Sequence, residues 1–159
     1  MISVFKEGLI SVNKGGKWGI MQITKVGGAI GEVLYSDIRA YINGYEIPAA
    51  NINGDTYVVL EDLGNYGFDW KWDGKNRTVT VTGWNKNKKF EPIPVPKETA
   101  KTGGFKCNYL YTDIRAYVGD KLVNGYNIDG QTMIYFDELK AYGKVTWDGQ
   151  KREIRLVCD

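Results

Sequence analysis

The chain contains no histidine, which removes the most versatile catalytic and metal-binding side chain. Without an imidazole, a Ser-His-Asp triad, a Cys-His pair and a histidine-ligated copper or zinc site are all excluded. The two cysteines, Cys107 and Cys158, are too few for a thiolate zinc site and are not spaced as C-x-x-C. The sequence therefore predicts neither a catalytic residue set nor a metal or cofactor site.

Strong charge and long apolar runs are also lacking. The formal net charge is +2 over 159 residues, and the basic residues are scattered, which argues against a nucleic-acid partner. No apolar run reaches the length of a membrane span, so no membrane insertion is expected. The start, MISVFKEGLISV, lacks the basic segment and long apolar core of a signal peptide. We therefore expect a cytosolic protein, a mature secreted form or an excised fragment.

Aromatic residues and glycine are abundant, with eleven Tyr, five Trp, five Phe and twenty Gly. This composition favours a sheet-rich chain with many tight turns. The most distinctive feature is a repeated heptad: YSDIRAY at 35–41 returns as YTDIRAY at 111–117.

The heptads belong to a longer internal repeat. Residues 27–67 align without gaps with residues 103–143, and one deletion later Trp72-Asp73-Gly74 aligns with Trp147-Asp148-Gly149. Matches run through almost the whole unit, which indicates duplication. We infer a first copy at 27–84 and a second at 104–159, preceded by an N-terminal β-hairpin element at 1–26.

Each copy predicts the order strand, strand, helix, strand, strand. The runs 35–42 and 56–60 have strand composition, and the Asn-Gly and Asp-Gly pairs at 53–54 and 129–130 predict hairpin turns. Residues 61–67 and 137–143 resemble short helices that end at glycine. The expected fold class is α+β: two tandem small modules, each a mainly antiparallel sheet packed on one short α-helix.

The segment between the copies, 85–103, is rich in lysine and carries alternate prolines at Pro92, Pro94 and Pro96. Alternating proline favours an extended, polyproline-like chain. We interpret this segment as an interdomain linker.

With the repeat laid out, the chain resembles the copper amine oxidase N-terminal-like (stalk) domain, present here in two tandem copies. The likeness rests on residues 42–81, namely the strand with an ING turn, the DL..YGF helix exit, and the W-D-G-K hairpin before R-T-V-T-V. The second copy departs at VGDKLVNGY (118–126), where the ING turn is missing. A fainter likeness joins FKEGLISVNKGGKWGIMQI (5–23) to one WG-type repeat.

The resemblance implies a non-enzymatic binding or spacer module of a secreted or surface protein from a Gram-positive bacterium. The implied partner is a cell-wall polysaccharide or another protein. One alternative is a carboxylate-dependent, glycosidase-like enzyme, since such chemistry needs no histidine or metal. Another is an intracellular or phage-encoded interaction protein, so a cytoplasmic location stays open.

The heptads supply the candidate ligand-binding residues. As a strand, each heptad places its tyrosines, Asp and Arg on one face and its Ile and Ala on the other. That polar face could bind sugar or peptide, or could be a solvent-side ladder in which Arg pairs with Asp. The candidates are Tyr35, Arg39, Tyr41, Tyr111, Arg115, Tyr117 and, outside the repeat pattern, Trp84.

Other side chains receive structural assignments. Period-two alternation places Phe68, Trp70 and Trp72 on one face, for which core packing is the simpler expectation, as it is for Trp147. The adjacent acids Glu61-Asp62 and Asp137-Glu138 suit the first turn of a helix better than paired acid–base work.

Cys107 and Cys158 fall in the first and last strands expected for the second copy. A disulfide there would join the ends of a small domain and fit an extracellular origin. Two unrelated reduced thiols are the alternative, and the sequence leaves the choice open.

Overall fold

A computed structural model describes residues 2–4, 10–14, 17–22, 28–97 and 100–159, with the first three ranges described as strands only. These are β1 (Ile2–Val4), β2 (Ile10–Lys14) and β3 (Lys17–Gln22), which form an antiparallel sheet in the order β1-β2-β3. Within the hairpin element predicted at 1–26, Gly15, Gly16 and the side chain of Trp18 lie outside the described part.

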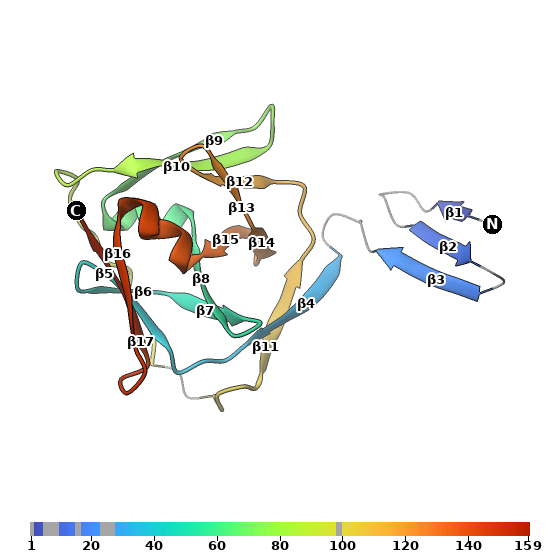
Figure 1. The fold of residues 1–159 in the computed structure, drawn as a ribbon, viewed down its shortest axis with the longest axis horizontal. Coiled ribbons are helices and arrows are strands. Elements are labelled where there is room, and N and C mark those ends of the chain that lie inside the picture. The colour runs from blue at the N-terminus through green and yellow to red at the C-terminus, as the bar shows by residue number, and fades with distance from the viewer. Residues whose placement is uncertain (1, 5–9, 15–16, 23–27, 98–99) are drawn as a thin grey trace.

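The two copies contain the same elements in the same order (Figure 1). The first copy has β4 (Ala29–Leu34), β5 (Arg39–Ile42), β6 (Tyr45–Ile47), β7 (Ala49–Ile52), β8 (Asp55–Val59), η2 (Glu61–Tyr66), β9 (Phe68–Asp73) and β10 (Thr78–Trp84). The second has β11 (Phe105–Leu110), β12 (Arg115–Val118), β13 (Lys121–Val123), β14 (Gly125–Ile128), β15 (Gln131–Tyr135), η3 (Phe136–Tyr142), β16 (Gly143–Asp148) and β17 (Glu153–Cys158).

The strands of the two copies are interleaved. A closed barrel runs β11-β14-β15-β8-β7-β4, with three strands from each copy. Two four-stranded sheets, β13-β12-β10-β9 and β16-β17-β5-β6, flank it (Figure 1). In the first of these sheets β10 pairs in parallel with β12, and in the second β17 pairs in parallel with β5. Every sheet formed by residues 28–159 thus contains strands of both copies.

The pairing has an approximate two-fold symmetry. Strand β8 lies antiparallel to its own equivalent β15, with Val58 opposite Ile134, and β4 lies antiparallel to its equivalent β11. The register of Thr78 with Arg115 is repeated by that of Glu153 with Arg39. The duplication seen in the sequence has therefore become a symmetric exchange of strands.

The predicted α+β class is wrong. Strands make up 53% of the structure and helix about 10%, and the helical segments described after residue 27 are two short 3-10 helices. The predicted pattern of one sheet on one α-helix in each module fails for the same reason. Local periodicity shows where strands lie, but it does not show which strands pair, and here the partners come from the other copy.

The apolar core is also shared. The larger cluster contains Leu63 and Phe68 of the first copy together with Phe136, Leu139 and Leu156 of the second, all with no exposed surface. A second cluster, around Val33 and Tyr109, lies within the barrel strands. Each copy thus buries its apolar residues against those of the other, which overcomes the size limit of a unit this small.

The predicted hairpin turns are present. Asn53 and Gly54 have φ values of 54° and 85°, and Asp129 and Gly130 have 52° and 77°. Two consecutive positive φ angles are typical of a type I′ turn, which matches the twist of the flanking strands. The side chain of Asn51 accepts a hydrogen bond from Gly54 N at 3.1 Å, and Asn127 accepts the equivalent bond from Gly130.

The tryptophans expected in the core are exposed. Trp72 lies opposite the buried Val79 on the core-facing side of its sheet, as the alternation requires, yet 48% of its surface is exposed. Trp70 and Trp147 are similarly exposed, at 38% and 52%, and only Phe68 is buried. β9 and β16 are edge strands of their sheets, and Phe68 is buried because the start of β9 packs on Trp84 and Tyr142.

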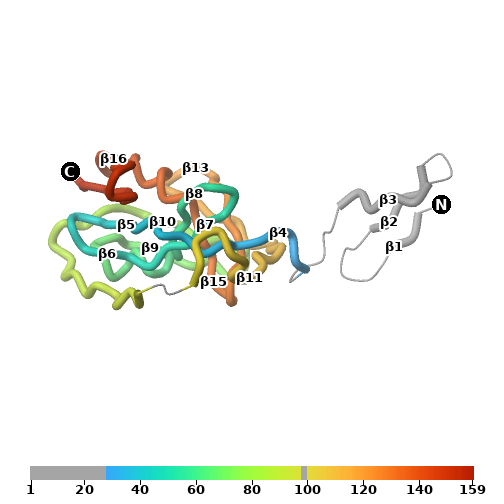
Figure 2. The backbone as a smooth tube through the Cα atoms, turned by 90° about the horizontal axis from the view of Figure 1, so that it is seen from below, coloured from blue at the N-terminus to red at the C-terminus, as the bar shows by residue number. Residues whose placement is uncertain are grey.

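The predicted linker lies against the body. It passes along the outside near β6 (Figure 2), and Asn65 binds it twice, accepting Glu91 N through its backbone carbonyl and donating to Glu91 O from its side chain. Lys88 Nζ donates to Phe68 O at 2.7 Å, and Phe90 packs against the rings of Tyr66 and Trp84. Residues 85–93 are therefore held in place rather than extended freely.

Candidate functional site

Each heptad is a turn followed by a strand. Residues 35–38 have no strand geometry, and the strand starts only at Arg39. The Ser36 hydroxyl accepts a hydrogen bond from Ile38 N at 3.0 Å, and the Thr112 hydroxyl accepts the same bond from Ile114 N at 3.1 Å. This side-chain turn explains why the one position that differs between the heptads still carries a small hydroxyl residue.

The heptad aspartates join the two copies. Asp37 accepts a hydrogen bond from Arg152 Nε at 2.8 Å, and Asp113 accepts two from Arg77 at 2.8 and 2.9 Å. Each arginine belongs to the other copy and precedes the strand that pairs in parallel with the heptad strand. The ladder interpretation expected the Asp and Arg of one heptad to pair with each other. They do not, because each Asp pairs with an arginine of the other copy.

This contact predicts a pH effect. The ion pair with Arg77 lowers the pKa of Asp113 below its ordinary value of about 3.9. A carboxyl with a depressed folded-state pKa stabilises the fold above the unfolded pKa and loses that contribution as pH falls through the folded value. In an NMR titration we expect Arg77→Gln to raise the pKa of Asp113 towards its ordinary value.

Asp148 provides the internal control for that titration. Its pKa is lowered by backbone donors at Lys151 and Gln150. It should be unchanged in Arg77→Gln. A pKa of Asp113 that does not respond to the substitution would contradict the assigned ion pair.

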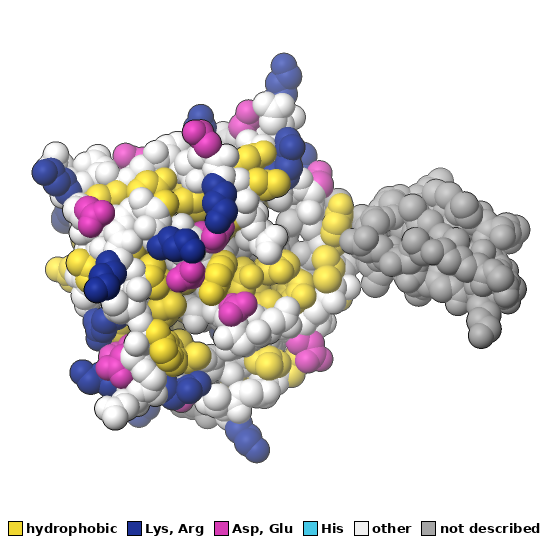
Figure 3. Space-filling model, viewed as in Figure 1, with side chains coloured by type: hydrophobic (Ala, Val, Ile, Leu, Met, Phe, Trp, Pro, Cys, Tyr) yellow, Lys and Arg dark blue, Asp and Glu magenta, His cyan; other side chains and the backbone are white. Residues whose placement is uncertain are grey.

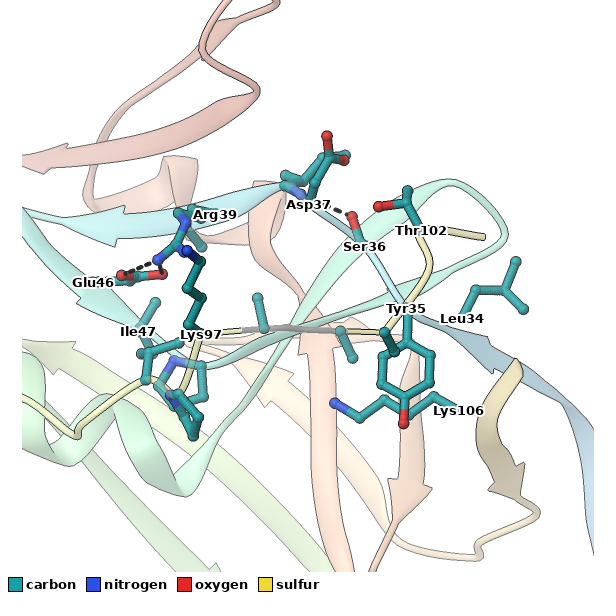
Figure 4. Close-up of a pocket in the computed structure, with 18 residues that line it drawn as sticks. Leu34, Tyr35, Ser36, Asp37, Arg39, Glu46, Ile47, Lys97, Thr102 and Lys106 are labelled. Carbon is teal, nitrogen blue, oxygen red and sulfur yellow. Dashed lines mark hydrogen bonds and ion pairs between the residues drawn. The ribbon is translucent and has the colours of Figure 1, made fainter. Parts of the chain in front are cut away.

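A cleft of about 430 Å³ opens between the first heptad and the connecting segment (Figure 4). The heptad forms one wall, and residues 46–50, which run from β6 into β7, form the floor. The opposite wall is supplied by Val95, Pro96, Lys97, Ala100, Thr102 and Lys106. Two backbone hydrogen bonds fix this second wall, from Tyr35 N to Gly104 O and from Gly103 N to Tyr35 O. The cleft thus depends on the segment that the sequence presented as a spacer.

The cleft carries three cationic side chains. Arg39 is neutralised by Glu46, with both carboxylate oxygens at 2.9 Å. Lys97 and Lys106 form no ion pair with any residue in the described ranges, and Lys106 Nζ lies 5.7 Å from the ring centre of Tyr35. The ring of Tyr35 and the ammonium groups of Lys97 and Lys106, without an ion pair to any described residue, thus line the same hollow (Figure 4).

The candidate residues are distributed over several places. Tyr35 and Arg39 lie in the cleft, whereas Arg115 and Tyr117 line a shallower groove on sheet β13-β12-β10-β9. Tyr41 lies under the guanidinium of Arg155, at 4.1 Å. The other two candidates line neither hollow: Tyr111 bonds Gly28 through its backbone, and Trp84 packs on Phe68 while donating to Asp159 O at 3.2 Å.

Sequence reasoning missed Lys97, Lys106 and Glu46. The two lysines lay outside or at the margin of the repeat pattern, in stretches interpreted as linker or as an ordinary strand. Nothing in local periodicity indicates that the connecting segment returns to face the first heptad. The alternating prolines were the available signal, since a stiff extended segment can form a wall.

The paired acids lie apart from both hollows. Burial raises the pKa of Glu61 and of Asp62, and Glu61 Oε2 has no hydrogen-bond partner among the described residues. In the second copy Glu138 pairs with Lys121 at 3.0 Å and Asp137 with Lys140 at 3.6 Å. Glycosidase chemistry needs two carboxyl groups across one bound sugar, and none of these four lines the cleft or the groove.

The cysteines are free thiols in different parts of the fold. Cys107 lies in the barrel strand β11 and packs on the smaller cluster, whereas Cys158 lies in β17 against the larger one. The disulfide considered above is thus not formed. Burial raises the pKa of both thiols, that of Cys158 to about 12, which disfavours the reactive thiolate.

Comparison of the chain with protein-family models, with curated proteins and with solved structures finds no match. The likeness to the stalk domain therefore stays a prediction from residues. The described residues include no helix that is both long and apolar enough to span a membrane. They also contain no cluster of three or more His, Cys, Asp or Glu side chains placed to hold a metal ion.

Proposed function

We propose that this chain is a non-catalytic binding module of a bacterial surface or secreted protein, and that its cleft takes a segment of an acidic cell-wall glycan. The observation that carries the proposal is the cleft itself, in which Lys106 lies 5.7 Å from the ring centre of Tyr35, Lys97 lies towards Arg39, and neither lysine has an ion pair with a described residue (Figure 4). Ammonium groups attract carboxylates or phosphates, and a tyrosine ring provides a surface on which a sugar can stack.

The construction of the cleft supports binding rather than turnover. Two of its charged side chains are held by neighbours, Arg39 by Glu46 and Asp37 by Arg152. A preformed site of this kind binds without losing much side-chain freedom. The proposed location at the bacterial surface rests on the resemblance of the residue pattern to the stalk domain.

Calorimetric titration with oligogalacturonate tests this function. The charge complementarity predicts that Lys97→Ala and Lys106→Ala each weaken oligogalacturonate binding several-fold, and that binding weakens as salt rises. Lys144→Ala is the matched control, because Lys144 is an exposed lysine of β16 that lines neither hollow. It should leave the affinity unchanged.

Two outcomes would count against the proposal. Equal loss in all three lysine variants would show that only net charge matters. Binding of poly-glutamate but not of oligogalacturonate would indicate that the partner is a protein with an acidic segment.

A further inference from the structure

A groove that shares no lining residue with the cleft lies beside the second heptad. It encloses about 510 Å³ on the outer face of sheet β13-β12-β10-β9. Its floor is formed by alternate residues of β10 and β12, and the residues between them, among them Val79, Val81 and Ala116, are buried in the shared core. Both strands are paired on each side, so the floor is rigid and offers no free edge for strand addition.

The two-fold symmetry supplies a comparison within the molecule. On the equivalent face of sheet β16-β17-β5-β6, Tyr41 is covered by Arg155, and Arg155 in turn donates to Glu153 at 3.1 Å. The positions equivalent to Glu153 and Arg155 are Thr78 and Thr80. Two short hydroxyl side chains thus occupy the positions at which sheet β16-β17-β5-β6 carries the Arg155–Glu153 ion pair.

The substitutions remove both ion pairs from beside the second heptad, so Arg115 is exposed where Arg39 is half-buried, while Tyr117 is half-buried as Tyr41 is. Leu122 replaces the partner of Arg39, Glu46, so Arg115 has no ion pair within the described ranges. Thr80 lies beside Tyr117 in the sheet and is too short to cover its ring. The pair β17–β5 is therefore covered by its own side chains, whereas the symmetry-related pair β10–β12 carries an open groove.

The chemistry of the groove fits a neutral ligand. Lys71 and Arg115 supply two positive charges, and Asp73 and Asp120 supply two negative ones, so the lining is formally neutral. The carboxylate of Asp73 is already engaged by Lys75 N, Asn76 N and the Asn76 amide. An acidic polymer has no net attraction to this face.

We infer that the groove is a second binding site, for a linear neutral glycan. The hydroxyls of Thr78, Thr80 and Thr82 form a row at two-residue spacing, roughly 6–7 Å apart, on one side of Tyr117. A sugar chain lying along the strands stacks one ring on Tyr117 and exchanges hydrogen bonds with the threonines and Arg115. The site is independent of the cleft and carries a different charge, so the two can bind different parts of one wall.

The test is an NMR titration of the whole chain with cellotetraose and with chitotetraose. Shifts of the backbone amides of β10 and β12 are expected with at least one of them. Tyr117→Ala and Arg115→Ala should each weaken that binding at least five-fold. Tyr41→Ala, the symmetry-related control, should not alter it.

A second variant transfers the closed arrangement to the groove. Thr78→Glu with Thr80→Arg places the ion pair of the other face over Tyr117 and should abolish binding, while thermal unfolding confirms the fold. The inference is overturned if neither oligosaccharide shifts these strands, if Tyr117→Ala binds as the parent does, or if oligogalacturonate is preferred there. Lys97→Ala, which should weaken binding in the cleft, should leave binding in the groove intact. The two proposals can therefore fail independently of each other.

Discussion

A chain that ends after Trp84 is expected not to fold, and to recover its structure when residues 103–159 are added as a separate peptide. Without the second copy, β5 loses its parallel partner β17, β10 loses β12, and the barrel loses three of its six strands. The first copy would then expose the apolar residues that it now buries against Phe136, Leu139 and Leu156. A unit of this size has little other means of stabilisation.

Circular dichroism and analytical ultracentrifugation of the two peptides, alone and mixed, measure this effect. Each peptide alone should lack a cooperative thermal transition, and the equimolar mixture should show one. A scrambled version of the 103–159 peptide is the control for non-specific association. A cooperative transition in the first peptide alone, as a monomer, would contradict the strand exchange, whereas a homodimer would fit the same pairing scheme.

Replacement of Phe136 by alanine is expected to lower the free energy of unfolding by about 3–5 kcal/mol, the usual cost of emptying a buried aromatic site. Phe136 has no exposed surface and packs in the cluster that both copies share. Because the core is continuous, the whole transition should move to lower denaturant concentration as one step. Two independent modules would instead show one shifted and one unshifted transition.

Phe105→Ala is the matched control, since Phe105 is 55% exposed on β11. Its effect should be far smaller than that of Phe136→Ala, because little apolar surface returns to water. Urea unfolding followed by tryptophan fluorescence and by circular dichroism measures both variants. Non-coincident transitions in the parent protein would contradict a single cooperative core.

The interleaved fold changes the meaning of the repeated heptad. Two heptads that differ at one position were interpreted as either a binding face used twice or a solvent-side ladder. In the structure their shared residues hold the copies together: the hydroxyl forms the turn, Asp receives an arginine from the other copy, and Ala is buried. The residues that differ around them, such as Glu46 against Leu122 and Arg155 against Thr80, make one face closed and the other open.

Much of the local structure could be predicted from the residues. The Asn-Gly and Asp-Gly turns are where the sequence placed them, because positive φ angles restrict which residues fit. The alternation on β9 predicted correctly that Trp72 faces the core side. Its exposure could not be predicted, since burial depends on whether a strand lies in the middle of a sheet or at its edge.

Of the candidate site, Tyr35 and Arg39 were foreseen and the lysines that face them were not. Tyr35 and Arg39 stood out because the heptad is repeated. Lys97 reaches the cleft because the connecting segment packs back on the first copy through Phe90 and Gly104, and Lys106 reaches it because β11 pairs with β4. Such a contact is set by packing between residues distant in sequence, which local patterns do not encode.

By itself, the sequence determined the duplication, the absence of imidazole chemistry and the positions of the Asn-Gly and Asp-Gly turns. These follow from composition, residue identity and backbone sterics, which act over a few residues at a time. The tertiary structure alone decided that the copies exchange strands, that one core serves both, and that the two heptad faces differ. Strand pairing and burial are properties of surfaces that meet, and the partner of each strand lies in the other half of the chain.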